Sequence, residues 1–241
     1  MIRATVIVLL LVAGFVVWNA PAGILRNAFN EAEGVDLVGT SGTLWQGNGT
    51  LVVDGAALGH LEWRIKASRL FALALAYDVQ LASEDIDLTG DLQGATGGFA
   101  AALNGRVTNA AINRALSTYQ ITMEGDVAVE GLDLAARYDR RIERLEGTLR
   151  WQGGEVLYPE ASGQQRASLP PLLAVLGSDA GHATASVFPE GGSTPVLMLR
   201  TLDDGYYRLS VTKLLTKLVG RPWRGSDPDH AVVVELEEQF L

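Results

Sequence analysis

The chain has 241 residues, of which 48% are hydrophobic and 7% aromatic, with 27 glycines and no cysteine. This composition favours a turn-rich β protein with a sizeable core over a helical bundle, and the lack of cysteine excludes disulfides and thiolate metal sites. The formal net charge of −9 argues against a nucleic-acid partner, because phosphate binding needs a basic surface.

An uncharged segment stands near the N-terminus. From Ala4 to Leu25 the chain carries no charged side chain. At about 1.5 Å per residue, a helix of this length crosses a bilayer core of about 30 Å, and Asn19 and Pro21 mark its expected exit. Arg3 is expected on the cytoplasmic side, where basic residues are retained. The segment therefore predicts one transmembrane anchor.

A cleaved signal peptide is the alternative for this segment, because Ala20-Pro21-Ala22 has the Ala-x-Ala spacing of a cleavage site. Proline at the middle position and the length of the apolar run favour retention. We therefore expect a cytoplasmic tip and transmembrane anchor in residues 1–25, and a β-rich domain on the outer side of the membrane in residues 26–241.

A short motif occurs twice. Gly42-Thr43-Leu44-Trp45-Gln46-Gly47 returns as Gly147-Thr148-Leu149-Arg150-Trp151-Gln152-Gly153, with Arg150 as a single insertion. A strand absorbs one inserted residue as a bulge or turns over beyond it, so both copies are predicted to begin equivalent strands. Trp45 and Trp151 are expected in the core, each with an indole N–H that needs a partner. The expected structural residues are Gly42, Leu44, Trp45, Gly47, Trp63, Gly147, Leu149, Trp151 and Gly153.

Two stretches after the first copy have strand patterns. From Leu61 to Lys66 apolar and charged residues alternate, which predicts one buried and one solvated face. From Leu73 to Leu81 large apolar residues occupy one face, and alanines occupy the first half of the other. This second pattern predicts a strand covered on both sides at its start, with a helix as the alternative.

Short apolar runs separated by turn residues continue to the C-terminus. They predict strands at Ile86–Leu88, Tyr119–Met123, Val127–Val129 and Leu132–Leu134, a hairpin from Val196 to Ser210, and a last strand from Ala231 to Leu236. They predict short helices at Asn109–Leu116 with Asn109 as its cap, at Leu172–Leu176 between Pro170-Pro171 and Gly177, and at Leu214–Val219.

The polar stretch Pro159–Ser168 is predicted as turns, and a sub-boundary of the domain is open near residues 158–168, although no linker favours two independent domains. The expected fold is mainly β. One N-terminal transmembrane helix precedes a curved, largely antiparallel sheet, in the form of an open barrel, groove or sandwich, with two or three short helices.

Site chemistry is sparse in this chain. His60, His182 and His230 each lack a second His or Cys at zinc-binding spacing, and the acidic groups at Glu84–Asp87 and Asp227–Asp229 do not continue into calcium loops. The nucleophile elbow, the phosphate loop and the dinucleotide fingerprint are all missing. We therefore expect no catalytic residue, no cofactor, no metal ligand and no enzymatic activity.

Four features taken together resemble type II secretion system protein N, the N subunit of the general secretion pathway: the N-terminal anchor, Ser41–Gly47, Leu61-Glu62-Trp63, and Leu169-Pro170-Pro171-Leu172-Leu173. The resemblance implies a single-pass inner-membrane protein of a Gram-negative bacterium with its bulk in the periplasm. It implies a non-enzymatic, accessory role in exporting folded proteins across the outer membrane. The implied partners are other type II secretion subunits and the inner-membrane bilayer.

A more distant resemblance connects the Gly-x-Leu-x-Trp strands to membrane-anchored β-groove proteins of the AsmA-like group. That resemblance implies the alternative function, a periplasmic groove that binds or transfers a lipid ligand. A lipid carrier needs a continuous apolar concavity. The charged second face of Leu61–Lys66 interrupts such a surface, so the secretion subunit is favoured.

Overall fold

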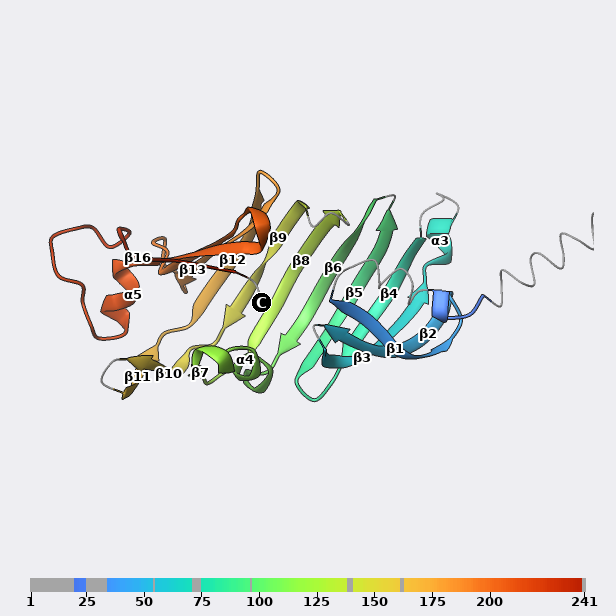
Figure 1. Cartoon of the computed structure of the whole chain (residues 1–241), viewed down its shortest axis with the longest axis horizontal. Coiled ribbons are helices and arrows are strands. Elements are labelled where there is room, and N and C mark those ends of the chain that lie inside the picture. Colours follow the sequence, from blue (N-terminus) through green and yellow to red (C-terminus); the bar gives the residue numbers. More distant parts are fainter. Residues whose placement is uncertain are drawn as a thin grey trace, which may run out of the picture. The chain divides into compact units, whose positions relative to one another are not determined.

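The computed structural model describes residues 20–24, 34–53, 55–70, 75–95, 97–137, 141–160 and 163–239. Within these ranges the chain is mainly β, as the sequence pattern predicts (Figure 1). Most of the predicted anchor, residues 1–19 and 25, lies outside the described residues. No helix in the described ranges is both long and apolar enough to cross a membrane.

The chain divides into two compact units. The first contains the residues up to Glu84 together with Thr89–Ala95. Its strands are β1 (Val35–Gly42), β2 (Gln46–Val53), β3 (Ala56–Ile65), β4 (Leu75–Ala82) and the second part of β5 (Ile86–Ala95), and α3 (Ala67–Leu70) follows β3.

The second unit contains Asp85–Leu88 and Thr96–Leu241. Its further strands are β6 (Gly98–Val107), β7 (Thr122–Met123), β8 (Val127–Arg137), β9 (Ile142–Trp151), β10 (Gly154–Glu160), β11 (Gly163–Leu169), β12 (Leu172–Asp179), β13 (His182–Pro189), β14 (Leu197–Thr201), β15 (Tyr206–Thr212) and β16 (Val232–Gln239). Its helices are α4 (Asn109–Ala115), η1 (Ser117–Tyr119), η2 (Asp203–Gly205) and α5 (Lys213–Leu218).

In the described part of the chain, 13 strands form one large antiparallel sheet in the order β1-β2-β3-β4-β5-β6-β8-β9-β12-β13-β14-β15-β16, and β11, β10 and β7 form a small one. Most neighbours in the large sheet follow one another along the chain, so short connections build it. The order ends at β16, which carries exposed Glu235, Glu237 and Glu238.

The core of the first unit lies on one face of its strands. Trp63 and Leu61 on β3 are 4% and 7% exposed and pack with Leu37, while Glu62 and Arg64 between them are exposed. The alternation predicted for this strand is therefore confirmed.

The next strand, β4, confirms a strand rather than a helix in the run that ends at Leu81. Tyr77 is in the core, with Val79 and Leu81 packed against it. Ala76, on the opposite face, is also buried, at 4% exposed, but Leu75 at the start of the strand is 44% exposed, so the predicted cover on both faces holds for Ala76 and Tyr77 and not for Leu75. Leu73 lies outside the described residues.

Several of the later predictions are confirmed. The helix predicted from Asn109 is α4, the helix predicted from Leu214 is α5, and β14, β15 and β16 form where a hairpin and a last strand are expected. The cap of α4 is different, because Thr108 rather than Asn109 occupies the N-cap position. Asp126 Oδ1 accepts the Asn109 backbone N–H at 3.0 Å and so replaces the expected side-chain cap.

The helix predicted at Leu172–Leu176 is wrong, because these residues begin β12. This strand is hydrogen-bonded to β9 on one side and to β13 on the other, with Leu172 opposite both Trp151 and Pro189. A strand in the middle of a sheet reads as a continuous apolar run, which cannot be told from a short buried helix by periodicity.

Three further segments depart from the sequence pattern. Tyr119 lies in η1, and only Thr122 and Met123 of the strand predicted around it pair, as β7. Val127 to Leu134 is one strand, in which Gly131 (φ +58°) sits at a bulge instead of a break. The polar stretch Pro159–Ser168 belongs to the β10–β11 hairpin; the sub-boundary near residues 158–168 stays a prediction.

Trp151 is 5% exposed, whereas Trp45 is only half-buried. We expect Trp151→Ala to lower the free energy of unfolding by about 3–5 kcal/mol, because the cavity is lined by core residues, and Trp45→Ala to lower it much less. Urea unfolding followed by circular dichroism measures both. Equal losses for the two variants would contradict this assignment.

Candidate functional site

The first copy of the motif forms a turn that holds residues 20–22, which lie in the last part of the predicted anchor. Pro21 makes a β-bridge with Thr43, and the Leu44 N–H donates to the Ala20 carbonyl at 2.8 Å. The Ala22 N–H donates to the Gly42 carbonyl at 3.3 Å, and Ala22 itself is 3% exposed within the core of the first unit. We call Gly42–Gly47 the turn clamp, because it joins residues 20–22 to the sheet.

The turn clamp is closed by its own hydrogen bonds. The Thr43 N–H donates to the Gln46 carbonyl at 2.8 Å, and Thr43 Oγ1 accepts the N–H groups of Trp45 and Gln46 at 3.3 and 3.2 Å. The indole N–H of Trp63 donates to the Thr43 carbonyl at 3.1 Å. These bonds satisfy backbone groups that the turn takes out of the β1–β2 ladder.

Gly47 is required by close packing. It stands opposite Trp63 in the β2–β3 pairing. A Cβ at this position would lie 2.4 Å from the Ser41 carbonyl oxygen and 2.6 Å from the Trp63 ring. The indole of Trp63 therefore occupies the space that a side chain at residue 47 would need.

The second copy is placed differently. Gly147 and Leu149 lie within β9 and Trp151 ends it, so the prediction that both copies begin equivalent strands is wrong. The Trp151 indole N–H donates to the Glu124 carbonyl at 2.7 Å. Gly153 (φ +83°) lies in the turn to β10, where a Cβ would approach Pro171 N at 2.8 Å.

The structural counterpart of Trp151 is thus Trp63, not Trp45. Both of these indoles are buried, and each donates to a backbone carbonyl of a connecting segment. The two short motifs do not reveal that Trp63 and Trp151 are equivalent, because Trp63 lies outside the first motif. Trp63 meets that motif only through the pairing of Gly47 with Trp63 across neighbouring strands. The sequence signal for it is a glycine placed where a bulky cross-strand neighbour needs room.

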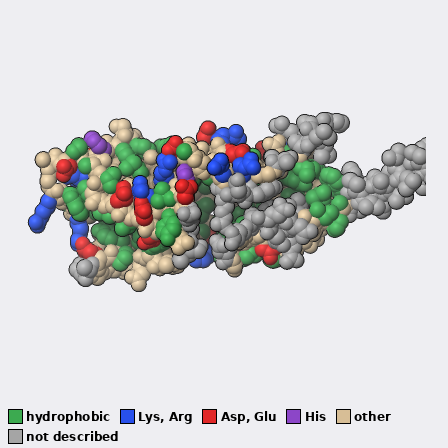
Figure 2. Space-filling model, turned by 45° about the horizontal axis from the view of Figure 1, so that its top comes forward, with side chains coloured by type: hydrophobic (Ala, Val, Ile, Leu, Met, Phe, Trp, Pro, Cys, Tyr) green, Lys and Arg blue, Asp and Glu red, His purple; other side chains and the backbone are tan. Residues whose placement is uncertain are grey.

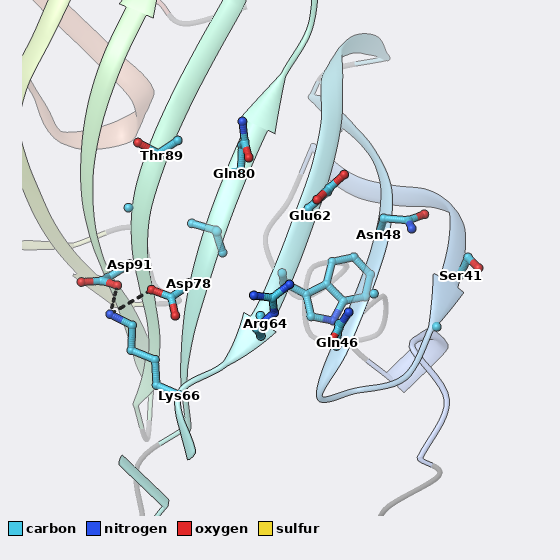
Figure 3. Close-up of a pocket in the computed structure, with 15 residues that line it drawn as sticks. Ser41, Gln46, Asn48, Glu62, Arg64, Lys66, Asp78, Gln80, Thr89 and Asp91 are labelled. Carbon is cyan, nitrogen blue, oxygen red and sulfur yellow. Dashed lines mark ion pairs between the residues drawn. The ribbon is translucent and has the colours of Figure 1, made fainter. Parts of the chain in front are cut away.

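The outer face of the first unit is a polar groove of about 680 Å³ (Figure 3). Cross-strand pairing places its polar side chains in rows, with Arg64 between Gln46 and Asp78, and Glu62 between Asn48 and Gln80. The residues that line it are Ser41, Gly42, Gln46, Gly47, Asn48, Glu62, Trp63, Arg64, Lys66, Asp78, Val79, Gln80, Thr89, Gly90 and Asp91.

One end of this groove holds an ion-pair cluster. Lys66 Nζ lies 3.1 Å from Asp78 and forms a second ion pair with Asp91, as Figure 3 shows. The carboxylates of Asp91 and Asp78 raise the pKa of Lys66 above its usual value. The groove offers amide, hydroxyl and carboxylate groups and one guanidinium, which suits hydrogen bonding to a polar partner rather than an apolar ligand.

The second unit has an apolar face. Residues directly opposite each other in neighbouring antiparallel strands point to the same side of a sheet, and the register places the Trp151 side chain together with a series of apolar residues from β6 to β16. They are Phe99, Leu103, Val129, Leu132, Leu134, Leu145, Leu149, Leu172, Leu176, Val187, Leu197, Leu199, Leu209, Val211, Val234 and Leu236. We call this set the apolar face.

The opposite face of these strands carries ion pairs. Arg144 lies 2.9 Å from Asp133. Arg208 lies 2.6 Å from Glu237 and 3.6 Å from Glu235. Figure 2 shows acidic and basic side chains side by side on the surface it presents. Exposed pairs of this kind contribute about 0–1 kcal/mol each. They therefore keep this face polar and solvated more than they stabilise the fold.

A tyrosine contact joins two distant parts of the second unit. Tyr119 Oη lies 3.0 Å from Tyr207 Oη, and the Tyr207 hydroxyl donates to Glu238 at 2.7 Å. These hydrogen bonds raise the pKa of Tyr207, that with Tyr119 contributing most. Tyr207 and Glu238 are opposite each other in the β15–β16 register, on the side of the apolar face.

Metal-binding side chain types are scattered over the described ranges. Within those ranges, no cluster of three or more His, Cys, Asp or Glu residues is arranged to hold a metal ion. His60 lies 4.0 Å from Glu62, and His182 lies 3.6 Å from Asp203. Each of these imidazoles therefore has a carboxylate as a neighbour.

These faces define a class of protein: a mainly β protein whose candidate sites are surfaces of one large sheet. The family profile of type II secretion system protein N matches residues 33–222. The chain belongs to this family, which confirms the resemblance drawn from its sequence, and membership implies a role in type II secretion. No curated protein and no solved structure matches the chain.

The packing of Gly47 against Trp63 generates a test of the turn clamp. We expect Gly47→Ala to lower the free energy of unfolding by about 1–3 kcal/mol, because the added methyl group forces the Trp63 ring or the turn to move. Gly94→Ala is the matched control, since no atom lies within 4 Å of a Cβ there, and it should not destabilise. Urea unfolding of both variants gives the comparison; a Gly47→Ala protein as stable as Gly94→Ala would show that the contact is unimportant.

Proposed function

We propose that this protein is an accessory, non-enzymatic inner-membrane subunit of the type II secretion machinery. In this role it supports the export of folded proteins from the periplasm across the outer membrane. The family match over residues 33–222 carries the proposal, because it extends through both compact units. The uncharged segment Ala4–Leu25 supports a single-pass anchor that leaves the β units in the periplasm.

The surfaces of the sheet agree with a role in assembly. The polar groove of the first unit presents unlike polar groups in ordered rows, and such surfaces give specificity in protein contacts through complementary charge and hydrogen bonding. We infer that other secretion subunits are the partners of these surfaces. We infer that the charged groups of the groove serve recognition. Glu62 and Arg64 stand at alternate positions of β3 and do not form a reaction centre.

Deletion of the gene in the native host, followed by complementation, tests the secretion role. We expect substrates of the type II pathway to fall several-fold in the medium and to accumulate in the periplasm, and the wild-type gene to restore export. A periplasmic marker controls for leakage, and a protein exported by another route controls for general damage to the envelope. Unchanged export in the deletion strain would contradict the proposal.

A second candidate function is lipid binding by the apolar face. The apolar side chains run across eight neighbouring strands of the second unit. This apolar face is wider than one helix packed on it would cover. Apolar surface of this extent in one layer is typical of a ligand or partner site.

The tyrosine contact supports an inward curvature of this face. η1 follows α4, which is tied to Asp126 just before β8, whereas Tyr207 is on β15, five strands away in the order. Five steps in a flat sheet are about 24 Å at roughly 4.8 Å per step. The 3.0 Å contact of Tyr119 with Tyr207 therefore supports a sheet that bends toward the apolar face.

Matched substitutions on β12 test lipid binding. Leu176 points to the apolar face and Val175, which is 45% exposed, to the opposite face. We expect phospholipid to co-purify with the full-length protein, to decrease several-fold with Leu176→Gln and to stay with Val175→Gln. Mass spectrometry quantifies the lipid, and circular dichroism checks the fold. Equal lipid in both variants, or no lipid above that of an unrelated single-pass protein, would reject this function without affecting the secretion role.

A further inference from the structure

Few residues separate the predicted cytoplasmic end of the anchor from the residues that bind the turn clamp. Ala4–Asn19 is the uncharged stretch that precedes the first clamped residue, Ala20. A helix of this length would span roughly 24 Å at about 1.5 Å per residue, which is less than the bilayer core of about 30 Å. A span this short draws the residues after it toward the membrane surface.

The residues that directly follow Asn19 are joined to the sheet. Ala20, Pro21 and Ala22 are all joined to the turn clamp by backbone hydrogen bonds or a bridge, and the Ala22 side chain is part of the core. A flexible linker would let the domain move away from the bilayer. Because residues 20–22 are joined to the turn, an anchor that ends at Asn19 would hold the turn in or beside the headgroup layer.

The side chains at the turn suit that position. Leu44 and Trp45 are half-buried, and Ile24, two residues after the clamped Ala22, is 47% exposed. Tryptophan is favoured at the membrane interface, where its ring meets apolar surface and its N–H stays among polar groups. The segment Gly42–Gly47 has no charged residue in a chain of net charge −9, so anionic headgroups do not repel it.

We propose that the turn clamp is a membrane-contact site, which seats Leu44 and Trp45 in the headgroup layer at the periplasmic surface of the inner membrane. The inference rests on the membrane anchor of the proposed function, but not on the role in secretion. The proposed membrane contact assigns the half-buried Trp45 a role that differs from the core packing of the buried Trp63 and Trp151.

The lack of cysteine in the chain makes a site-specific probe direct. Leu44→Cys and Ala56→Cys are labelled with the fluorophore NBD in the full-length protein and reconstituted in phosphatidylethanolamine–phosphatidylglycerol vesicles. Ala56 is exposed at the other end of the β2–β3 hairpin, opposite Val53, roughly 23 Å along β2 from the turn. Spin-labelled lipid in the headgroup region should quench the label at residue 44 several-fold more strongly than the label at residue 56.

Release of the clamp provides the second measurement. Ala22→Asp places a carboxylate in the core position of Ala22, 3% exposed, and should detach residues 20–22 from the turn. In this background we expect quenching at residue 44 to fall to the level at residue 56, while the protein still floats with the vesicles. Equal quenching at both positions in the unaltered clamp overturns the membrane contact. Loss of flotation in the Leu44→Cys protein overturns the anchor as well; export measured in the deletion strain is independent of both.

Discussion

The alternation of side chains along each strand determines which face of the sheet is apolar and which is polar. Each strand has two faces, and a sheet of one layer must bury one of them to be stable. In the first unit that face carries Trp63 and Tyr77; in the second it carries Trp151 and Val129. The opposite faces accept rows of polar groups and ion pairs. Both candidate surfaces, the polar groove and the apolar face, follow from this division.

Two indole hydrogen bonds connect the strands to the segments that link them. A tryptophan ring supplies a large buried area, and its N–H needs an acceptor inside the protein. Trp63 finds it at Thr43 in the turn clamp, and Trp151 finds it at Glu124 beside β7. The same side chains that fill the cores therefore help to position the non-strand segments, including the turn that holds residues 20–22.

Local patterns predicted the parts of the fold in which one face is buried. The Leu61–Lys66 alternation, α4 and α5 are in place because amphipathic periodicity survives in the folded chain. Leu172–Leu176 was predicted as a helix because a strand paired on both sides loses that alternation. The polar groove and the turn clamp could not be predicted, since they depend on the register of β2 against β3 and on residues 20–22 meeting residues 42–44.

The acidic residues of β16 have a consequence for self-association. Strands at the end of a sheet offer backbone groups on which another chain can grow an aggregate. Glu235 and Glu237 share one face of the last strand in the order and Glu238 lies on the other, and Arg208 offsets the first two among the described ion pairs. A second copy aligned along this strand would bring carboxylates against carboxylates. Such repulsion disfavours the addition of a further strand from a second copy of the chain.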